Sequence, residues 1–503
     1  MTGHTTRCWR FGSAILVGFM VLAGTDLGAQ QRDEFYWLGE INEASAVMLV
    51  EQGIVPKDLA AHIARAVTSV MSDGNKPGAA RPGDYLDFEQ LLIAVGGPDV
   101  TRVHSGRSRQ DIKGTIRRLF MREDLLLAFE RLIETRDSLL TAAEAHRDAI
   151  VPAYTYGVQA QPTSFGHYMA AYAEALGRTA DRYRETWSRV NQSSLGSAAL
   201  GTSSFPVNRP RLAELLGFDG NVTNSLDANQ IAPLDTGVEV ASVATSGALT
   251  IGMLAADLTA QYSHVKPWLT LSGSDVTGTS SIMPQKRNPT GLVDLRQQAS
   301  TIVGQAMTYT VQSHNVAVGM EDYKMDTPSQ VLKASARMYG AVVSLMKALA
   351  FDEKRALDEV NAEYSTTTEL ADTLQRVADV PFRIGHHFAS ELVNYGRGHN
   401  LRPAEIPYQE ARRIYAESAR VFRQSPAELP LSEAEFRRSL TPENMVQSAQ
   451  GLGGPQSREV ARMLADERAR LAVDRQWLAG RRESLRRAEA MREAAFGALK
   501  ANR

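Results

Sequence analysis

Cysteine is almost missing from this 503-residue sequence, which has only Cys8. The rest of the chain therefore has no intrachain disulfide and no thiol nucleophile. An excess of one charge is also missing, because 55 lysines and arginines stand against 57 aspartates and glutamates, for a net charge of -2. This balance gives no electrostatic reason to expect nucleic acid or an anionic membrane as a partner. A small anionic substrate would need only a local basic pocket.

Strand patterns and metal-ligand patterns are scarce as well. No alternation of apolar and polar residues has a useful length, and the glycine-rich loops do not follow strands, which argues against a nucleotide-binding α/β fold. The ten histidines form no i, i+4 helical pair with carboxylates, and the adjacent His386 and His387 point to different faces. We therefore expect no metal site and no cofactor.

Helical periodicity is what the sequence does contain, beginning with a small N-terminal domain of short helices. Residues 235–262 are small and apolar nearly all round, which predicts a helix at the centre of a bundle or at a subunit interface. Residues 467–502 form a charged, arginine-rich tail helix, for which the simplest interpretation is a solvated face. Further helices are predicted over residues 112–149, 165–190, 289–314, 327–360 and 367–395.

The first thirty residues differ from the rest in composition. Arg7 and Arg10 precede an apolar run over residues 11–23, and the small residues up to Ala29 suit signal-peptidase cleavage. The run is shorter than the roughly twenty residues that span a bilayer, so a retained anchor is the weaker alternative. Residues 1–29 therefore predict a signal peptide and an exported protein, periplasmic or secreted, with no membrane contact after cleavage.

Three polar clusters interrupt the helical pattern, at residues 103–111, 154–164 and 278–289. The first brings backbone N–H groups at a helix start together with arginines, which suits a carboxylate or phosphate, although a plain N-cap with solvated arginines remains possible. The second lies between two helices and has hydroxyls and amides that could cap them. The third has two hydroxyls, a lysine and an asparagine, with Gly278 expected to be a flexible end; its alternative is a surface turn.

Together these clusters resemble one enzyme family. Residues 278–289 (Gly-Thr-Ser-Ser-Ile-Met-Pro-Gln-Lys-Arg-Asn-Pro) resemble the Gly-Ser-Ser-x-Met-Pro-x-Lys-x-Asn-Pro signature of the fumarase/aspartase superfamily. Residues 104–111 are similar to the His-Thr-Gly-Arg-Ser-Arg-Asn-Asp segment of argininosuccinate lyases, and residues 159–167 to their Ala-Gln-Pro-Thr-Thr-x-Gly-His segment. Matches at residues 224–228, 368–383 and 440–460 extend the resemblance over nearly the whole mature chain.

The resemblance implies an all-α fold of three helical domains with a long central helix bundle, which assembles into a homotetramer whose active sites each draw on three subunits. The boundaries we expect are residues 30–111 for the N-terminal domain, 112–364 for the central bundle with the signature loop, and 365–503 for the C-terminal domain with returning bundle helices. The implied substrate is a small dicarboxylate with a fumarate moiety.

The resemblance also implies roles. Such enzymes remove a barely acidic proton next to a carboxylate and expel an amine or hydroxide, leaving fumarate, so fixed donors must stabilise a developing dianion. Ser280 matches the base, and Lys286 matches the signature cation. The residues that match substrate-binding positions are Ser108, Arg109, Gln110, Thr155, Gln161, Ser281, Met283 and Asn288.

The chain departs from the family on the side of the leaving group. Argininosuccinate lyases have a histidine, usually assigned to proton donation, where this chain has Tyr156, and its glutamate partner falls at Val293. Asp294 is no simple replacement, because one residue on a helix turns the side chain by about 100°. Tyr156 could be the proton donor, although a phenol is a weaker acid than imidazolium. In residues 316–328 only Glu321 and Asp322 align convincingly with the family's Tyr-Asn-x-Asp-Leu-Gln-Glu-Asp-Lys stretch.

The leading hypothesis is therefore an exported carbon–nitrogen lyase that cleaves an N-substituted aspartate to fumarate and an amine, or runs in reverse. One alternative is strict argininosuccinate lyase activity despite Tyr156 and Val293. The other is an exported helical scaffold or binding protein that has kept the fold and lost the chemistry.

Overall fold

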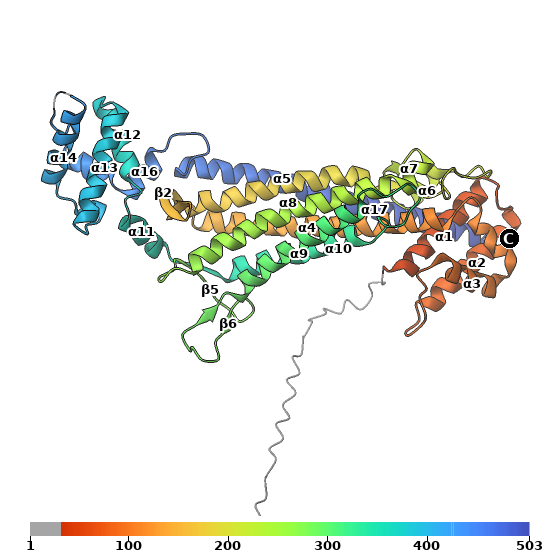
Figure 1. The fold of residues 1–503 in the computed structure, drawn as a ribbon. Helices are drawn as coiled ribbons and strands as arrows, with labels where there is room; N and C mark the ends of the chain where they lie inside the picture. Colours follow the sequence, from red (N-terminus) through yellow and green to blue (C-terminus); the bar gives the residue numbers. More distant parts are fainter. Residues whose placement is uncertain (1–31, 424, 426, 502–503) are drawn as a thin grey trace, which may run out of the picture.

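The computed structural model describes residues 32–423, 425 and 427–501. The predicted signal peptide, residues 1–29, lies outside the described residues. A long helical bundle forms the middle of the elongated molecule, with a small helical domain at each end (Figure 1). The expected all-α class with a central bundle is confirmed.

Six long helices make up the bundle, and α4 packs against α5 and α10 while α8 packs mainly against α9. α17 returns along α4 and α5 to the N-terminal domain. The bounds of these helices are α4 Arg109–Ala145, α5 Phe165–Val190, α8 Ala232–Tyr262, α9 Thr290–Ser313, α10 Thr327–Ala348 and α17 Ser457–Ala501.

The small residues of α8 allow this close packing. A Cβ at Gly247 would overlap the Tyr339 hydroxyl on α10, so only glycine fits there. α8 is also the one described helix that is long and apolar enough to cross a membrane, but half of its most apolar stretch is buried inside the bundle. Leu249 and Met253, 59% and 66% exposed, mark an apolar face of α8 that this single chain leaves uncovered.

The domain at one end comprises α1 Glu34–Glu51, α2 Lys57–Gly74, α3 Tyr85–Gly96 and η1 Pro98–His104. Its core also takes apolar residues from the start of α4 and the end of α17. The opposite domain comprises α12 Thr367–Ala378, α13 Phe382–Gly398, η2 Pro403–Glu405, α14 Tyr408–Val421, α15 Glu433–Ser439 and α16 Pro442–Ser448, and α11 Glu353–Ala362 joins it to the bundle. Two short helices, α6 Arg209–Leu215 and α7 Ser225–Gln230, precede α8.

A β-hairpin corrects the expectation that the chain has no strand of useful length. β1 Ile150–Thr155 and β2 Val158–Ser164 pair antiparallel, joined by Tyr156 and Gly157. Both joining residues have left-handed φ, 54° and 74°, as a tight two-residue hairpin turn requires. A bulge between Ala153 and Tyr154 and prolines in both strands break the alternation that would have revealed the hairpin.

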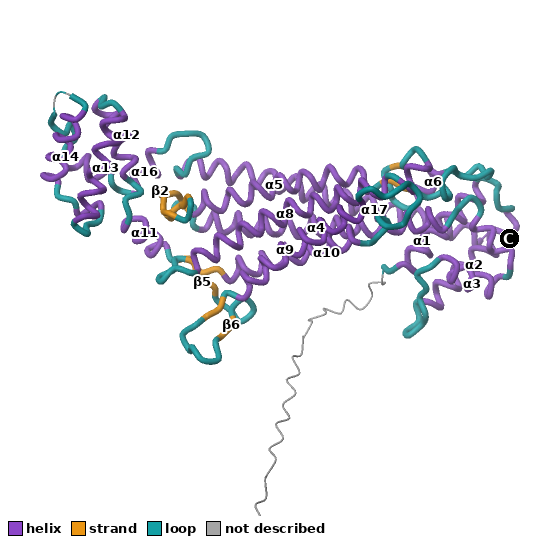
Figure 2. Tube along the Cα trace, in the orientation of Figure 1, coloured by secondary structure: helices purple, strands orange, loops and turns teal. Residues whose placement is uncertain are grey.

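Six shorter strands complete the fold: β3 Gln192–Ser193, β4 Gly220–Asn221, β5 Leu269–Leu271, β6 Gly278–Thr279, β7 Arg287–Asn288 and β8 Leu349–Phe351. Strand β8 interrupts the helix predicted over residues 327–360, because it leaves the bundle to pair with β5. The helix predicted over residues 367–395 is likewise broken, by the left-handed Asp379 and by Pro381. Figure 2 shows strands β5 and β6 beside a loop that stands away from the bundle.

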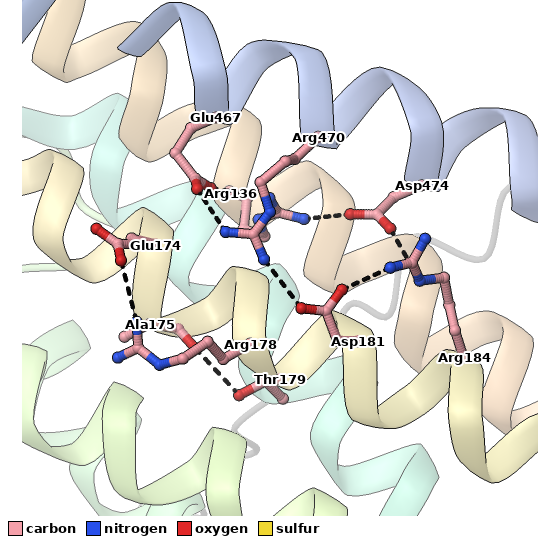
Figure 3. A network of polar contacts seen from close by, with 10 residues as sticks. All are labelled: Arg136, Glu174, Ala175, Arg178, Thr179, Asp181, Arg184, Glu467, Arg470 and Asp474. Carbon is pink, nitrogen blue, oxygen red and sulfur yellow. Dashed lines mark hydrogen bonds and ion pairs between the residues drawn. The ribbon is translucent and has the colours of Figure 1, made fainter. Parts of the chain in front are cut away.

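The tail helix corrects a third expectation, since one face of α17 is not solvated. Glu467, Asp474 and Arg492 are each at most 5% exposed. Figure 3 shows Glu467 and Asp474 turned toward Arg136 of α4. Their charges are paired with other side chains rather than hydrated. A run of charged residues in the sequence is compatible with either arrangement.

Candidate active site

The first polar cluster forms the N-terminus of α4. Ser108 is the N-cap, and its Oγ accepts a hydrogen bond from the Gln110 N–H at 3.2 Å. Asp111 Oδ1 accepts one from the Ser108 N–H at 2.8 Å, which completes a capping box. Asp111 Oδ2 also accepts the N–H groups of Gly196 and Ala198, at 2.9 and 3.0 Å. Residues 108–110 therefore rest on a fixed backbone.

The two arginines of this cluster have different environments. Arg107 is buried and donates to Ser45 Oγ and Asn42 Oδ1, both at 2.9 Å. Arg109 has a side chain that is 52% exposed, with Nη1 3.7 Å from Asp84 Oδ1. The interpretation that guanidinium groups of this segment face an anion is therefore wrong for Arg107, whose partners are structural. Arg109 is the one that can reach a substrate.

Gln110 lies beside a buried lysine that was not among the predicted site residues. Lys324 is 5% exposed, and its Nζ donates to Gln110 Oε1 at 3.2 Å, Gln230 Oε1 at 2.9 Å and Glu321 Oε1 at 3.1 Å. Gln110 Nε2 in turn donates to Glu321 Oε1 at 2.9 Å. These three contacts use all the N–H groups of the ammonium, so Lys324 holds the Gln110 side chain in place at the start of α4. The signal for Lys324 in the sequence is weak, because the alignment of Glu321 and Asp322 places the family's lysine at Tyr323, one residue earlier.

The second cluster is the hairpin β1–β2. Thr155 ends β1 and is exposed, and Gln161 is exposed on β2. Tyr156 occupies the turn, and its side chain is as exposed as in an extended chain. The side chains proposed to meet the substrate thus face outward. The alternative that hydroxyls of this cluster cap a helix holds for Ser164, the N-cap of α5, whose Oγ accepts a hydrogen bond from the His167 N–H at 3.1 Å.

The third cluster, the signature loop, is itself a small hairpin. Gly278 pairs with Asn288 and Thr279 with Arg287, so residues 280–286 form the turn. The ladder holds both ends of the loop, including Gly278, which we expected to be a flexible end. Exposed residues of the turn include Ser281, Met283 and Lys286, whereas Asn288 is partly covered.

Ser280 lies at the start of this turn in a setting that favours an alkoxide. Its Oγ accepts hydrogen bonds from the N–H groups of Met283 at 3.1 Å and Ile282 at 3.4 Å. Donors that point at the oxygen stabilise its anion more than the neutral hydroxyl. Lys286 lies three residues beyond Met283 in the same turn and adds positive charge.

Within one chain the three clusters do not meet. α4 has 37 residues, which makes it about 55 Å long. Residues 108–110 lie at its first turn, and the hairpin follows its last turn, at the opposite end of the bundle (Figure 1). α8 ends and α9 begins at that same end, so the signature loop lies near the hairpin and far from residues 108–110.

Val293, where the sequence departs from the family, and its neighbour Asp294 point in different directions. Val293, in the first turn of α9, is 40% exposed. Asp294 instead lines a groove of about 500 Å³ with Gln298 and Lys347, while Val293 is not among its lining residues. Asp294 therefore faces a different direction, as its one-residue offset predicted.

The motif histidines are structural. His104 stacks on Tyr85 with ring centroids 4.4 Å apart, and burial lowers its pKa to about 4. His167 Nδ1 is 2.8 Å from Thr163 Oγ1, and its Nε2 is 2.9 Å from Gly453 O. In the described part of the chain, no three His, Cys, Asp or Glu side chains are grouped as metal ligands.

Comparisons with known proteins agree with this geometry. A lyase family model matches residues 92–304, and a model of the argininosuccinate lyase C-terminal region matches residues 364–447. Argininosuccinate lyase of Methanosarcina barkeri is 32% identical over 447 residues, covering 87% of this chain and 88% of the relative. Argininosuccinate lyase 2 of Agrobacterium fabrum is 33% identical over 452 residues, covering 86% of each.

Among solved structures, EDDS lyase in complex with formate superposes with a TM-score of 0.84 at 28% identity, covering 93% of this chain and 92% of that one. Fumarate lyase from Mesorhizobium sp. BNC1 shares the fold, with a TM-score of 0.68 at 19% identity, and covers 87% of this chain and 96% of its own. With the signature loop, the α4 N-terminus and the hairpin all present, the chain belongs to the argininosuccinate lyase family of the fumarase/aspartase superfamily.

Proposed function

We propose that this chain, a carbon–nitrogen lyase, cleaves an N-substituted aspartate by β-elimination to fumarate and an amine. The observation that carries the proposal is the signature loop, in which Ser280 Oγ accepts two backbone N–H groups and Lys286 and Asn288 follow at the signature spacing. The similar EDDS lyase is also known as a variant with bound fumarate, which supports a dicarboxylate ligand.

The reaction begins when Ser280, as its alkoxide, takes the proton from the carbon next to one substrate carboxylate. The electron pair moves into that carboxylate, and Lys286 and Asn288 stabilise the resulting dianion. The pair then forms the double bond of fumarate as the carbon–nitrogen bond breaks, and the nitrogen leaves with the electrons of that bond. The amine takes its proton from Tyr156 or from water. Residues 108–110, of which Gln110 is held by Lys324, and Thr155 hold the carboxylates.

The site is completed by other copies of the chain, in a homotetramer. The length of α4 keeps residues 108–110 away from the signature loop of the same chain, so a neighbouring chain must bring them together. Exposed apolar residues on α8 and α9 supply a surface for this assembly: Leu249, Met253, Met307 and Val311. Sedimentation at equilibrium tests the tetramer, and a monomer that is fully active would contradict it.

The leaving amine differs from that of argininosuccinate. The residues on the fumarate side are present, but the histidine and glutamate expected near the leaving nitrogen are Tyr156 and Val293. The names of the relatives favour strict argininosuccinate lyase activity as a second candidate. Incubation with argininosuccinate alone decides between the two, because only the second candidate releases fumarate from it.

The chain acts outside the cytoplasm, since residues 1–29 have the composition of a signal peptide. N-terminal sequencing of the protein from the periplasm or medium should find a start at residue 30. A full-length protein confined to the cytoplasm would contradict export.

The activity is tested with purified protein, fumarate and a broad panel of amines, by following the fumarate absorbance. Ser280→Ala should lower turnover by about 10²- to 10⁴-fold with unchanged circular dichroism, because the base is lost. Ser274→Ala, in the exposed segment before the loop, is the control and should behave as wild type. No turnover with any amine, when a control lyase works, would favour the non-enzymatic scaffold.

A further inference from the structure

One carboxylate contacts both the β1–β2 hairpin and the stem of the signature loop, which is the segment of residues 263–277 between α8 and Gly278. Tyr154 of β1 donates its hydroxyl to Glu359 Oε1 on α11, and His264 Nδ1 lies 3.4 Å from the same oxygen. The rings of Tyr154 and His264 are nearly perpendicular, with centroids 6.2 Å apart. Glu359 is only 14% exposed, so solvent screens this contact weakly.

The position of these groups relates them to the catalytic segments. Tyr154 directly precedes Thr155 and Tyr156, the two hairpin residues of the proposed site. His264 follows the last turn of α8, where the chain leaves the bundle toward Ser280. A movement of Glu359 would therefore displace both the hairpin turn and the stem of the loop.

α11 holds both segments by further bonds, so it is the common support. Arg355 Nε donates to Lys266 O in the stem at 2.8 Å. On the hairpin side, Gln159 Nε2 donates to Val360 O at 3.3 Å and to Ser365 Oγ at 2.9 Å. Glu359 differs from Arg355 and Gln159 because its single carboxylate contacts both the hairpin and the stem.

The cluster also has unused hydrogen-bonding groups. Gln261 Oε1 and Glu359 Oε2 are buried without a protein partner among the described residues, while the Trp268 N–H interacts with the Tyr154 hydroxyl. An unpaired buried polar atom costs about 1–3 kcal/mol, so an arrangement of the loop that pairs these atoms would be favoured.

We propose that Glu359 is a positioning residue for the lyase reaction. By binding Tyr154 and His264 at once, it sets the turn that carries Thr155 and Tyr156 and the stem of the loop that carries Ser280. The chain lacks the carboxylate–imidazole pair of its family at Tyr156 and Val293, and a different carboxylate–imidazole pair, Glu359–His264, lies behind the hairpin. The inference rests on the proposed function, because the segments that Glu359 positions are those of the lyase site.

The test uses the full chain and has one readout that needs no catalysis. Trypsin can cut residues 263–289 only after Lys286 and Arg287, because Lys266 is followed by Pro267. Glu359→Gln keeps the size of the side chain but removes the charge that binds His264. Cleavage after Lys286 or Arg287, identified by mass, should become about tenfold faster, the factor expected for losing one charge-assisted hydrogen bond. The kcat should fall by about the same factor, with KM for fumarate within about threefold of wild type, because residues 108–110 and Lys324 are untouched.

A matched control lies on the same helix. Glu353→Gln breaks the contact between Glu353 Oε1 and His146 Nδ1, 2.7 Å apart, which touches neither the hairpin nor the loop, and it should match wild type in both readouts. If Glu359→Gln does not fold by circular dichroism, Tyr154→Phe removes the other half of the contact and leaves Glu359 with His264 alone, and faster cleavage is expected there too.

Wild-type cleavage and kcat in the folded Glu359 or Tyr154 variant would overturn the inference. A loss of kcat with an equal loss in Glu353→Gln would also overturn it, since the effect would then belong to α11 as a whole. If the wild type turns over no amine, the proposed function fails, but the protease comparison still decides whether Glu359 positions the loop.

Discussion

Replacing Arg136 with methionine should loosen the attachment of α17 to the bundle. Arg136 is fully buried on α4, and its guanidinium binds Glu467 Oε2 at 3.0 Å and the carboxylate of Asp474 (Figure 3). The two carboxylates are only 7% and 4% exposed. Each keeps one other partner, Arg470 at 2.7 Å from Glu467 and Arg184 at 3.4 Å from Asp474, but these arginines are 39% and 30% exposed.

The expected loss follows from this burial. Removing one partner of a buried ion pair costs about 3–5 kcal/mol, because the other charge stays desolvated. The remaining arginines compensate in part, so we expect about 3 kcal/mol for Arg136→Met. Arg178→Met is the matched control on the neighbouring helix: its pair with Glu174, at 3.4 Å, is 56% exposed on both sides and should contribute less than about 1 kcal/mol.

Urea unfolding followed by tryptophan fluorescence measures the difference. Trp477 on α17 packs against Phe129 and Trp187, with ring centroids 5.0 and 5.7 Å away, so its emission reports whether α17 is docked. Arg136→Met should unfold at a clearly lower urea concentration than wild type and Arg178→Met. Replacing Glu467 and Asp474 with leucine in the same variant should recover much of the loss. Equal midpoints for Arg136→Met and wild type would refute the assignment of a buried, stabilising cation.

Two further predictions concern the substrate site and pH. Lys324→Met should raise KM for fumarate by about 10- to 100-fold, since Gln110 loses the charge-assisted bond that holds it, whereas the exposed Lys333→Met should not; steady-state kinetics would refute the role of Lys324 if the two variants agree. Burial raises the pKa of Glu40 to about 7, although Arg492 binds it. The native protein then holds a proton that the unfolded chain releases, so stability falls as pH rises from about 5 to 7. Glu40→Gln should flatten this fall in Tm between pH 5 and 8, and a fall as steep as in wild type would contradict it.

Several elements could be predicted because their signals are local. Ser108 followed by Asp111 marks the start of α4, and the structure has the helix begin at Arg109 with both capping bonds present. The small apolar residues 235–262 also give a local signal: they predict that α8 packs in the bundle, because small side chains allow helices to approach closely. The hairpin β1–β2 was not predicted. Its turn residues, Tyr156 and Gly157, both have left-handed conformations, and a tyrosine gives no sequence signal for such a conformation.

The sequence by itself determined the helical class and the three clusters, because hydrophobic period, capping residues and the signature motif lie in neighbouring residues. The chemistry on the carboxylate side is what the resemblance to the family implies. Tertiary structure alone decided which charges are buried: Arg107 turned inward, Lys324 placed beside Gln110, and Arg136 enclosed by α17. It also decided that residues 108–110 and the signature loop of one chain lie at opposite ends of the bundle. Burial and separation depend on contacts between residues that lie from 62 to 331 positions apart in these examples, and no local pattern encodes them.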